Sequence, residues 1–253
     1  MIRSERTGAI CRLVIDRPER RNAIDAATAR ALGEAIEAAH RDAAVRALVI
    51  AGSNGVFSTG RDLKASAAAA EADGQARDPF SEDDAWVRIF HLLHRASMPS
   101  VAVVDGYAVA GGFTLAMGCD FVLATKRAKF GAFEMRHGFP AAVCTPLLAR
   151  LVGPRLGLEF ALFGEEISAE RLAQAGLINR LAEDAADLAH IEAAFVGRLA
   201  ALDPRAVKMT RDTFRAAETM PLDQALDMGR QLNQLIGSLG GFADAGKKLT
   251  GNR

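Results

Sequence analysis

In the first half of the chain, apolar residues form short strand-like runs in some segments and recur at helical spacing in another. Short unbroken apolar runs, each followed closely by a proline or a glycine, have the length and β-branched content of buried strands. These runs are 9–15, 47–51 and 100–105. Leu32, Ile36 and Ala39 recur at helical spacing, and Asp25 precedes them as a capping residue for a helix that ends near His40. The order of strand, loop and helix predicts an α/β fold.

Only the helical pattern remains in the last part of the chain. Asp203 and Pro204 form a typical helix start, with Asp at the cap and Pro in the first turn. One helix is expected over 205–215 and a second over 222–239. The chain therefore ends in a helical region.

Two intermediate segments give weaker patterns. Ala65 to Asp84 is rich in Ala, Asp and Glu and has no apolar period until a helix begins near Trp86. We interpret it as a mobile flap or an alanine-rich helix. Ser168 and Gly176 bracket a short helix, and a strand-like run begins at Ile178.

Composition narrows the class of protein. The 253 residues are 50% hydrophobic, enough for a sizeable core, and 31 basic residues balance 31 acidic ones. A zero net charge leaves no basic excess for nucleic acid. The N-terminus has no sustained apolar run, and the most apolar stretch, 100–124, contains Asp105 and Asp120, so we expect neither a signal peptide nor a membrane span but a cytoplasmic protein.

Common cofactor and metal signatures are missing from the sequence. There is no GxGxxG before a helix, no GxxxxGK[ST] and no HExxH. The three cysteines, Cys11, Cys119 and Cys144, have no CxxC spacing and are expected to be buried free thiols. No metal site is predicted.

Three segments carry candidate chemistry, and two of them follow expected strands. They are FSTGRDLK at 57–64, DGYAVAGGFT at 105–114 and FGAFEM at 130–135. Glycines let a ligand approach the backbone, and the N–H groups of a helix's first turn carry partial positive charge. Two such groups converging on one oxygen form an oxyanion hole. Each segment alone is more typical of an ordinary turn.

The combination of segments resembles the enoyl-CoA hydratase/isomerase (crotonase) family. SVAVVDGYAVAGGFTLAMGCD resembles the family's core strand, loop and helix, and VFSTGRDLK resembles its earlier oxyanion and CoA-binding loop. GEEISAERLAQAGLINRL and DRPERRNAID resemble a later helix-strand passage and the N-terminal CoA-binding stretch. The likeness covers nearly the whole chain in the right order.

The resemblance implies an α/β fold with a crotonase-like spiral of ββα units over 1–196, followed by a C-terminal helical oligomerisation region over 197–253. It implies a homotrimer or homohexamer that acts on acyl-CoA thioesters and needs no cofactor, because coenzyme A is part of the substrate. The N–H groups of Arg61 and Gly111 would form the oxyanion hole. The implied substrate-binding residues are Arg21, Ala23, Thr59, Gly60, Arg61, Asp62, Leu63, Lys64, Tyr107, Gly111 and Phe139.

Two acidic positions of the family matter for the reaction, and this sequence keeps one. Glu134 matches the second catalytic glutamate, whereas Thr114 stands where hydratases usually carry the first. Thr114 can position a water but is not an ionised base near neutral pH. We therefore favour double-bond isomerisation or related enolate chemistry over 2-enoyl-CoA hydration. His137 is either a second acid/base or a structural histidine.

Two other classes of function remain open at this stage. A catalytically silent acyl-CoA binding protein predicts thermal stabilisation by CoA without turnover. An RNA-associated family member is disfavoured by the balanced charge.

Overall fold

A six-stranded sheet forms the centre of the protein. The structure is a computed structural model and describes residues 1–63, 65 and 79–241, with side chains at 79–82 excepted. The sheet runs in the order β1-β2-β3-β4-β6-β9; β1 is antiparallel to β2, and the other neighbours are parallel. The strands are β1 (Ile2–Thr7), β2 (Ile10–Ile15), β3 (Ala47–Gly52), β4 (Ser100–Val104), β6 (Phe121–Thr125) and β9 (Arg180–Ala182).

A second, small sheet lies beyond the ends of the first. It has the order β5-β7-β8 and consists of β5 (Tyr107–Val109), β7 (Lys129–Gly131) and β8 (Ile167–Ser168). The chain passes from β4 straight into β5 and from β6 into β7, so successive strands alternate between the two sheets. An isolated bridge from Ser58 to Ala108 brings the loop after β3 to the same small sheet. These crossings produce the repeated ββα pattern.

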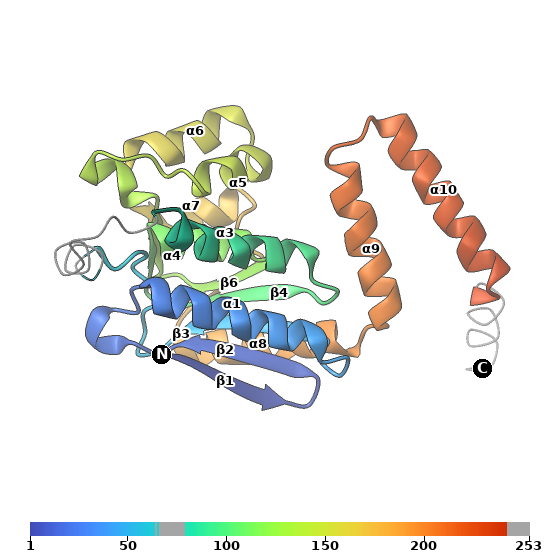
Figure 1. Ribbon diagram of the computed structural model, residues 1–253, viewed down its shortest axis with the longest axis horizontal. Coiled ribbons are helices and arrows are strands. Elements are labelled where there is room, and N and C mark those ends of the chain that lie inside the picture. Colours follow the sequence, from blue (N-terminus) through green and yellow to red (C-terminus); the bar gives the residue numbers. More distant parts are fainter. Residues whose placement is uncertain (64, 66–78, 242–253) are drawn as a thin grey trace. The chain divides into compact units, whose positions relative to one another are not determined.

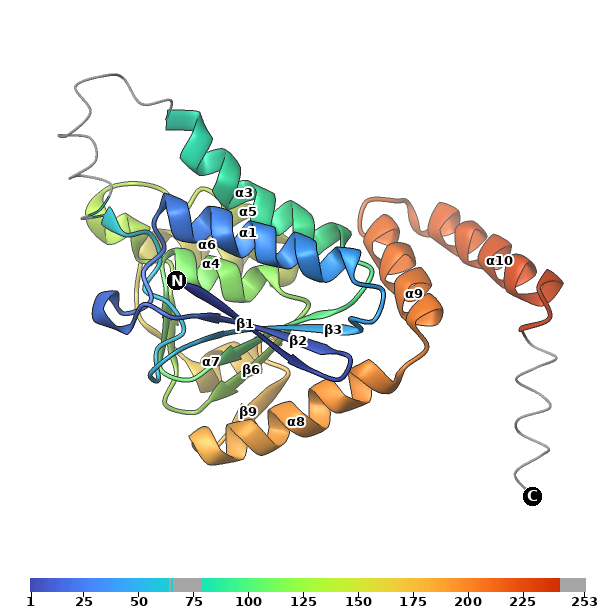
Figure 2. The same cartoon turned by 60° about the horizontal axis from the view of Figure 1, so that its bottom comes forward.

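Helices cover both faces of the large sheet (Figure 2). The helices α1 (Ala26–Arg41) and α3 (Pro79–Arg95) lie side by side over one face, while α8 (Ala185–Ala201) covers the other. Alternate residues of β3 enter the two cores: Leu48 and Ile50 face one, and Val49 faces the other. Unbroken apolar runs in the sequence reflect this double coverage.

Shorter helices complete the first unit, which extends to Leu202 (Figure 1). The two 3₁₀ turns are η1 (Pro18–Arg20) and η2 (Phe133–His137), and the α-helices are α4 (Gly111–Gly118), α5 (Cys144–Leu151), α6 (Pro154–Phe163) and α7 (Ala169–Gln174). Within the described ranges, no helix combines the length and the hydropathy that crossing a bilayer requires.

The second compact unit begins at Asp203 and contains two helices. They are α9 (Pro204–Ala217) and α10 (Leu222–Ser238). The Asp203 carboxylate caps α9 by accepting bonds from the Arg205 and Ala206 amides, both at 2.9 Å. Neither helix has a buried residue in this chain, although large apolar side chains such as Phe214 and Leu222 lie on them.

The structure confirms most of the expected elements. Asp25 caps α1 by accepting a bond of 2.7 Å from the Thr28 amide, and Ser168 caps α7. The three cysteines are free and buried, as expected. The strand expected from Ile178 begins two residues later. Of the expected flap at 65–84, the stretch 66–78 lies outside the described residues, and α3 begins at Pro79.

Candidate active site

The loop after β3 is held in place by one buried side chain. Asn22 has no solvent exposure and a left-handed backbone, with φ of 56°. Its Nδ2 donates to the carbonyls of Ser53 (2.9 Å) and Val56 (2.6 Å), and its own carbonyl accepts from the Ser58 hydroxyl at 2.8 Å. The N-terminal segment and this loop therefore form one rigid unit.

An ion-pair network holds residues 60–62, at the C-terminal end of the same loop. The Arg17 guanidinium lies 3.0 Å from the Asp25 carboxylate and 3.4 Å from the Asp62 carboxylate. Asp62 is only 5% exposed, so its charge requires this partner. Backbone bonds from Ile24 to Gly60 (2.7 Å) and from Asp62 to Ile24 (3.0 Å) run alongside. Residues 60–62 are thus fixed on both sides.

The anchored loop meets the start of α4 at very short range. A Cβ atom on Gly60 would lie 2.5 Å from the Gly111 nitrogen, and a Cβ atom on Gly111 would lie 3.5 Å from the Arg61 nitrogen. The two backbone amides predicted for the oxyanion hole are therefore neighbours. Gly111 is the first residue of α4, where an N–H has no acceptor within the helix.

Ala110 turns the chain into α4 with an unusual backbone. Its φ of 50° and ψ of −126° form a combination that normally only glycine adopts. Its amide donates to the Gly131 carbonyl at 2.8 Å, and its own carbonyl accepts from the Thr114 amide at 3.0 Å. The hydrogen bonds hold this strained residue and join the start of α4 to β7.

Trp86 of α3 closes the space beside Gly111. Its Cζ2 atom lies 3.4 Å from the Cβ position of Gly111, and its ring makes an edge contact with Phe90, with centroids 5.0 Å apart. Sequence analysis predicted Trp86 only as the start of an amphipathic helix, because a helical period does not indicate which loop a side chain covers. The amides thus have an aromatic neighbour.

Glu134 lies in η2, shortly after β7. One carboxylate oxygen, Oε2, is buried and finds no hydrogen-bond partner among the residues that the structure describes. Burial raises the pKa of Glu134 above its usual value, while a hydrogen bond from its own backbone amide and the charge of nearby His137 oppose that shift. A buried oxygen without a partner is costly, so it marks a place prepared for another proton or hydrogen bond.

Thr114 of α4 and Cys144 of α5 are buried, and Cys144 lies within reach of the charge of this carboxylate. Thr114 is 2% exposed and Cys144 is 1% exposed. Burial raises the pKa of the Cys144 thiol to about 12, the negative charge of Glu134 adds to the shift, and a hydrogen bond with Thr114 opposes it. Cys144 is therefore a buried, neutral thiol within reach of the charge of Glu134, whereas the sequence marked it only as a buried cysteine.

The remaining residues of the expected substrate path form a partly open surface. The Arg21 guanidinium stands over the Tyr107 ring at 5.4 Å, and the Thr59 hydroxyl donates to the Arg21 carbonyl at 3.2 Å. Leu63 and Phe139 are exposed, whereas Ala23 is buried. Phe139 stacks on His137, with ring centroids 6.2 Å apart. Lys64, also expected here, lies outside the described residues.

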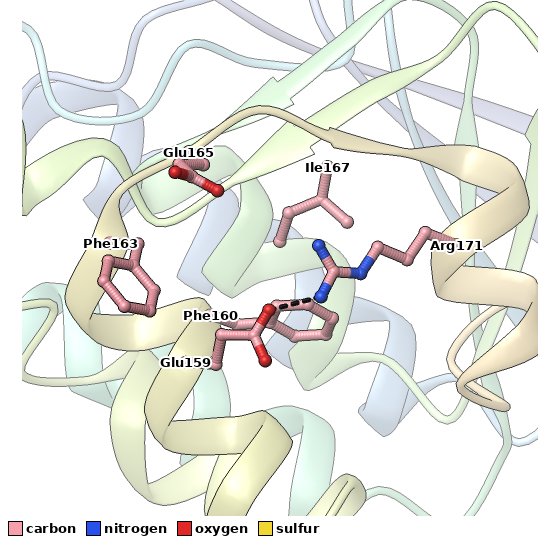
Figure 3. Close-up of a pocket in the computed structure, with 6 residues that line it drawn as sticks. All are labelled: Glu159, Phe160, Phe163, Glu165, Ile167 and Arg171. Carbon is pink, nitrogen blue, oxygen red and sulfur yellow. Dashed lines mark hydrogen bonds and ion pairs between the residues drawn. The ribbon is translucent and has the colours of Figure 1, made fainter.

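A small surface hollow is lined by residues of α6, β8 and α7 and contains none of the expected site residues (Figure 3). Arg171 and Glu159 form an ion pair across it, and the Arg171 guanidinium stands 5.2 Å over the Phe160 ring. Arg171 and Glu159 thus neutralise each other, and Glu165 is the other charged residue of its lining. Among the described residues, no group of three or more His, Cys, Asp or Glu side chains is placed to hold a metal ion.

Comparisons with known proteins agree with this arrangement. A model of the family described as enoyl-CoA hydratase/isomerase matches residues 5–239. The 2,3-dehydroadipyl-CoA hydratase of Escherichia coli K12 is 32% identical over 225 residues, which cover 88% of this chain and 85% of that protein. The carnitinyl-CoA dehydratase of Salmonella typhi is 31% identical over 221 residues, which cover 87% of this chain and 82% of that protein.

A solved structure of an enoyl-CoA hydratase has the same fold as this chain. The crystal structure of an enoyl-CoA hydratase from Polaromonas sp. JS666 superposes with a TM-score of 0.88 at 28% sequence identity. The match covers 100% of this chain and 97% of that one. The spiral of ββα units with its helical C-terminal region is therefore confirmed.

Proposed function

Because the chain belongs to the enoyl-CoA hydratase/isomerase family, we propose that this acyl-CoA enzyme shifts the double bond of an enoyl-CoA, or carries out a related enolate reaction. Glu134 is the single acid/base, and the amides of Arg61 and Gly111 bind the thioester oxygen. The observation that supports this proposal most directly is the buried Oε2 of Glu134, which has no hydrogen-bond partner within the described part of the chain.

The proposed oxyanion hole acts on the charge that the reaction creates. Removing a proton from the carbon next to a thioester moves an electron pair onto the carbonyl oxygen. Two preorganised amides stabilise this oxygen more strongly as its charge grows, and one such donor is typically worth about 3 to 4 kcal/mol of barrier. The close approach of Gly60 to Gly111 supports this assignment. The reaction requires no further cofactor.

A single carboxylate is sufficient for the isomerisation. Glu134 removes a proton from C2 of a 3-enoyl thioester, the dienolate forms, and the same carboxyl returns the proton to C4 while the double bond moves to C2. A raised pKa suits this exchange, because the group must both accept and release the proton. Thr114 contributes no second base, because its hydroxyl donates to the Ala110 carbonyl at 3.3 Å.

Hydration of a 2-enoyl-CoA is the second candidate, and the names of the relatives favour it. One relative is a hydratase and another a dehydratase of acyl-CoA substrates. In this version Glu134 activates the water alone, next to Thr114. The two reactions differ in substrate, so direct assays distinguish them.

For the substrate, we propose that CoA follows residues 59–64, with Arg21 and Ala23 along its path, Tyr107 beside the loop and Phe139 near the acyl chain. Among the residues that the structure describes, no carboxylate pairs with the exposed Arg21 guanidinium, which stands over Tyr107, so its charge is available to a phosphate. We also propose that the protein assembles as a trimer or a hexamer through α9 and α10, whose apolar side chains find no cover in one copy.

The test compares 2-enoyl-CoA and 3-enoyl-CoA substrates by following the absorbance of the conjugated thioester. We expect the wild type to convert 3-enoyl-CoA, and Glu134→Gln to lower kcat by about 1,000-fold, since the base is lost. Glu165→Gln makes the same change at an exposed glutamate between α6 and β8; it is the matched control and should have the activity of the wild type. Thermal stabilisation by CoA without turnover of either substrate would instead identify a binding protein.

A further inference from the structure

A mostly buried guanidinium joins the segment before α1 to the loop after β3. The Arg17 side chain is 15% exposed, and its Nη2 atom lies 3.0 Å from the Asp25 carboxylate and 3.4 Å from the Asp62 carboxylate. Its Nη1 atom donates to the Ala23 carbonyl at 2.6 Å. One side chain therefore binds the capping residue of α1, the segment before that helix and the loop.

Asp62 is oriented through both of its carboxylate oxygens. Oδ2 accepts a hydrogen bond from Arg17, and Oδ1 accepts one from the Ala65 amide at 3.1 Å. The residue is 5% exposed, so water cannot take the place of the guanidinium. Loss of Arg17 would therefore leave a buried charge uncompensated.

The position of Asp62 matters because Arg61 lies between two anchored residues. On its N-terminal side, the Gly60 amide donates to the Ser58 hydroxyl at 3.1 Å. On its C-terminal side, the anchor is the ion pair of Asp62 with Arg17. The proposed oxyanion amide of Arg61 is thus held by groups on both sides of it.

The backbone bonds of Ile24 determine the direction of that amide. The Ile24 amide donates to the Gly60 carbonyl at 2.7 Å, and the Ile24 carbonyl accepts from the Asp62 amide at 3.0 Å. The peptide group between Gly60 and Arg61 is planar, so its carbonyl and its N–H point in opposite directions. Because the carbonyl points to Ile24, the Arg61 N–H points away from it, and its nitrogen lies 3.5 Å from the Cβ position of Gly111.

We propose that Arg17 is a positioning residue, whose ion pair with Asp62 keeps the loop in register with Ile24 and thereby aims the Arg61 amide at the substrate oxygen. This inference rests on the proposed function in assigning that amide to the oxyanion hole. Arg17 acts through Asp62 and does not itself touch the reacting atoms. Its charge and its forked shape, rather than its volume, carry the effect.

Infrared spectra of bound butyryl-CoA test the direction of the amide without turnover, because this thioester has no double bond to move. Hydrogen bonds to the carbonyl oxygen weaken the C=O bond and lower its stretching frequency, and an isotope label at the thioester carbon separates its band from those of the protein. We expect a lowered frequency in the wild type and a smaller decrease in Arg17→Met, which has no charge. Arg17→Lys keeps the charge without the fork and should lie between them.

Arg12→Met is the matched control for these spectra and for activity. Arg12 lies in β2 and forms a partly buried ion pair with Glu192 of α8, so the same change removes a similar pair that does not touch the loop. We expect this variant to have the carbonyl band and the kcat of the wild type.

Kinetics separate positioning from stability, with each variant assayed at a temperature at which it is folded. Arg17→Met should lower kcat about 30-fold, less than the typical loss of a whole oxyanion donor, and change KM by less than about threefold. It should also lower Tm, because it leaves the Asp62 carboxylate unpaired. The double variant Arg17→Met/Asp62→Asn removes that charge, and it should recover most of the Tm but not the kcat.

Several results would overturn the proposal. Arg17→Met with the carbonyl band and kcat of the wild type would do so, as would an equal loss in Arg12→Met. A double variant that recovers kcat together with Tm would show that Arg17 acts on stability alone. A wild type that binds butyryl-CoA without a lowered frequency would refute the role of the Arg61 amide itself. If the wild type lowers the frequency but converts no enoyl-CoA, the proposed function fails while the infrared series still tests the role of Arg17.

Discussion

Burial at Glu134 affects activity and stability in opposite directions. A general base must be ionised, and burial raises the pKa of this carboxyl above its usual 4.5. We expect kcat/KM to fall as pH decreases through that raised pKa, because Glu134 takes up one proton. A pH–rate profile measures the pH at which this fall occurs. An acid limb at or below the ordinary carboxyl value would contradict the assignment of Glu134 as the base.

The same shift predicts an increase in stability when the charge is removed. A carboxyl whose pKa is higher in the folded than in the unfolded protein binds its proton more tightly when folded, so ionisation lowers the free energy of unfolding as pH rises past the ordinary value. Glu134→Gln should therefore have a higher Tm than the wild type at pH 7. The difference should shrink below pH 4.5, where both side chains are neutral. An equal or lower Tm at neutral pH would argue against this.

At Gly60, an added side chain would press against the amides proposed for the oxyanion hole. Its φ is 83°, and an added Cβ would lie 2.5 Å from the Gly111 nitrogen. Gly60→Ala should push the two amides apart and lower kcat by about 100-fold or more. Gly176→Ala is the matched control, because that glycine has φ of 78° with nothing within 4 Å of its Cβ position. Equal losses of activity in both variants would mean that backbone strain, and not displacement of the two amides, causes the loss.

On the scale of elements, the conformation of the loop after β3 depends on the side chain of Asn22, which comes from the segment before α1. Asn22→Ala would remove the donors to the Ser53 and Val56 carbonyls, and each unsatisfied buried group costs about 1 to 3 kcal/mol. We expect a loss of several kcal/mol in the free energy of unfolding, measured by urea denaturation. Asn54→Ala is the control, because Asn54 is exposed and also left-handed, with φ of 55°. A similar loss there would contradict the role of the buried hydrogen bonds.

At the scale of the whole molecule, the sequence predicted the elements that have a strong local pattern. Apolar runs located β2, β3 and β4, and the capping residues located α1 and α7. The edge strand β1 was missed, because its residues IRSERT are mostly exposed and show no apolar alternation. An edge strand that lies outside the core leaves little trace in hydrophobicity.

The parts of the site that the sequence did not predict depend on contacts between distant segments. Trp86 reaches Gly111 from α3, and the Cys144 thiol of α5 lies within reach of the charge of Glu134. The left-handed backbone of Ala110 was not expected either, since local preference would place glycine there. Motif order suggested the two amides and Glu134 as candidates, whereas the neighbours that hold them in place could be found only from the coordinates.

The helical C-terminal unit leads to the prediction about assembly. Phe214, Leu222, Leu226, Leu235 and Leu239 are between 51% and 75% exposed in one copy. So much exposed apolar surface on two helices is typical of an interface. We expect a mass in solution of three or six times the 26.9 kDa of one chain, measured by light scattering after gel filtration.

Leu226→Glu should shift the protein to smaller species, because it would place a charge in that interface. Gln224→Glu adds the same charge at another exposed position of α10 and should leave the mass unchanged. A wild type that elutes as a monomer at micromolar concentration would rule out this role for the two helices.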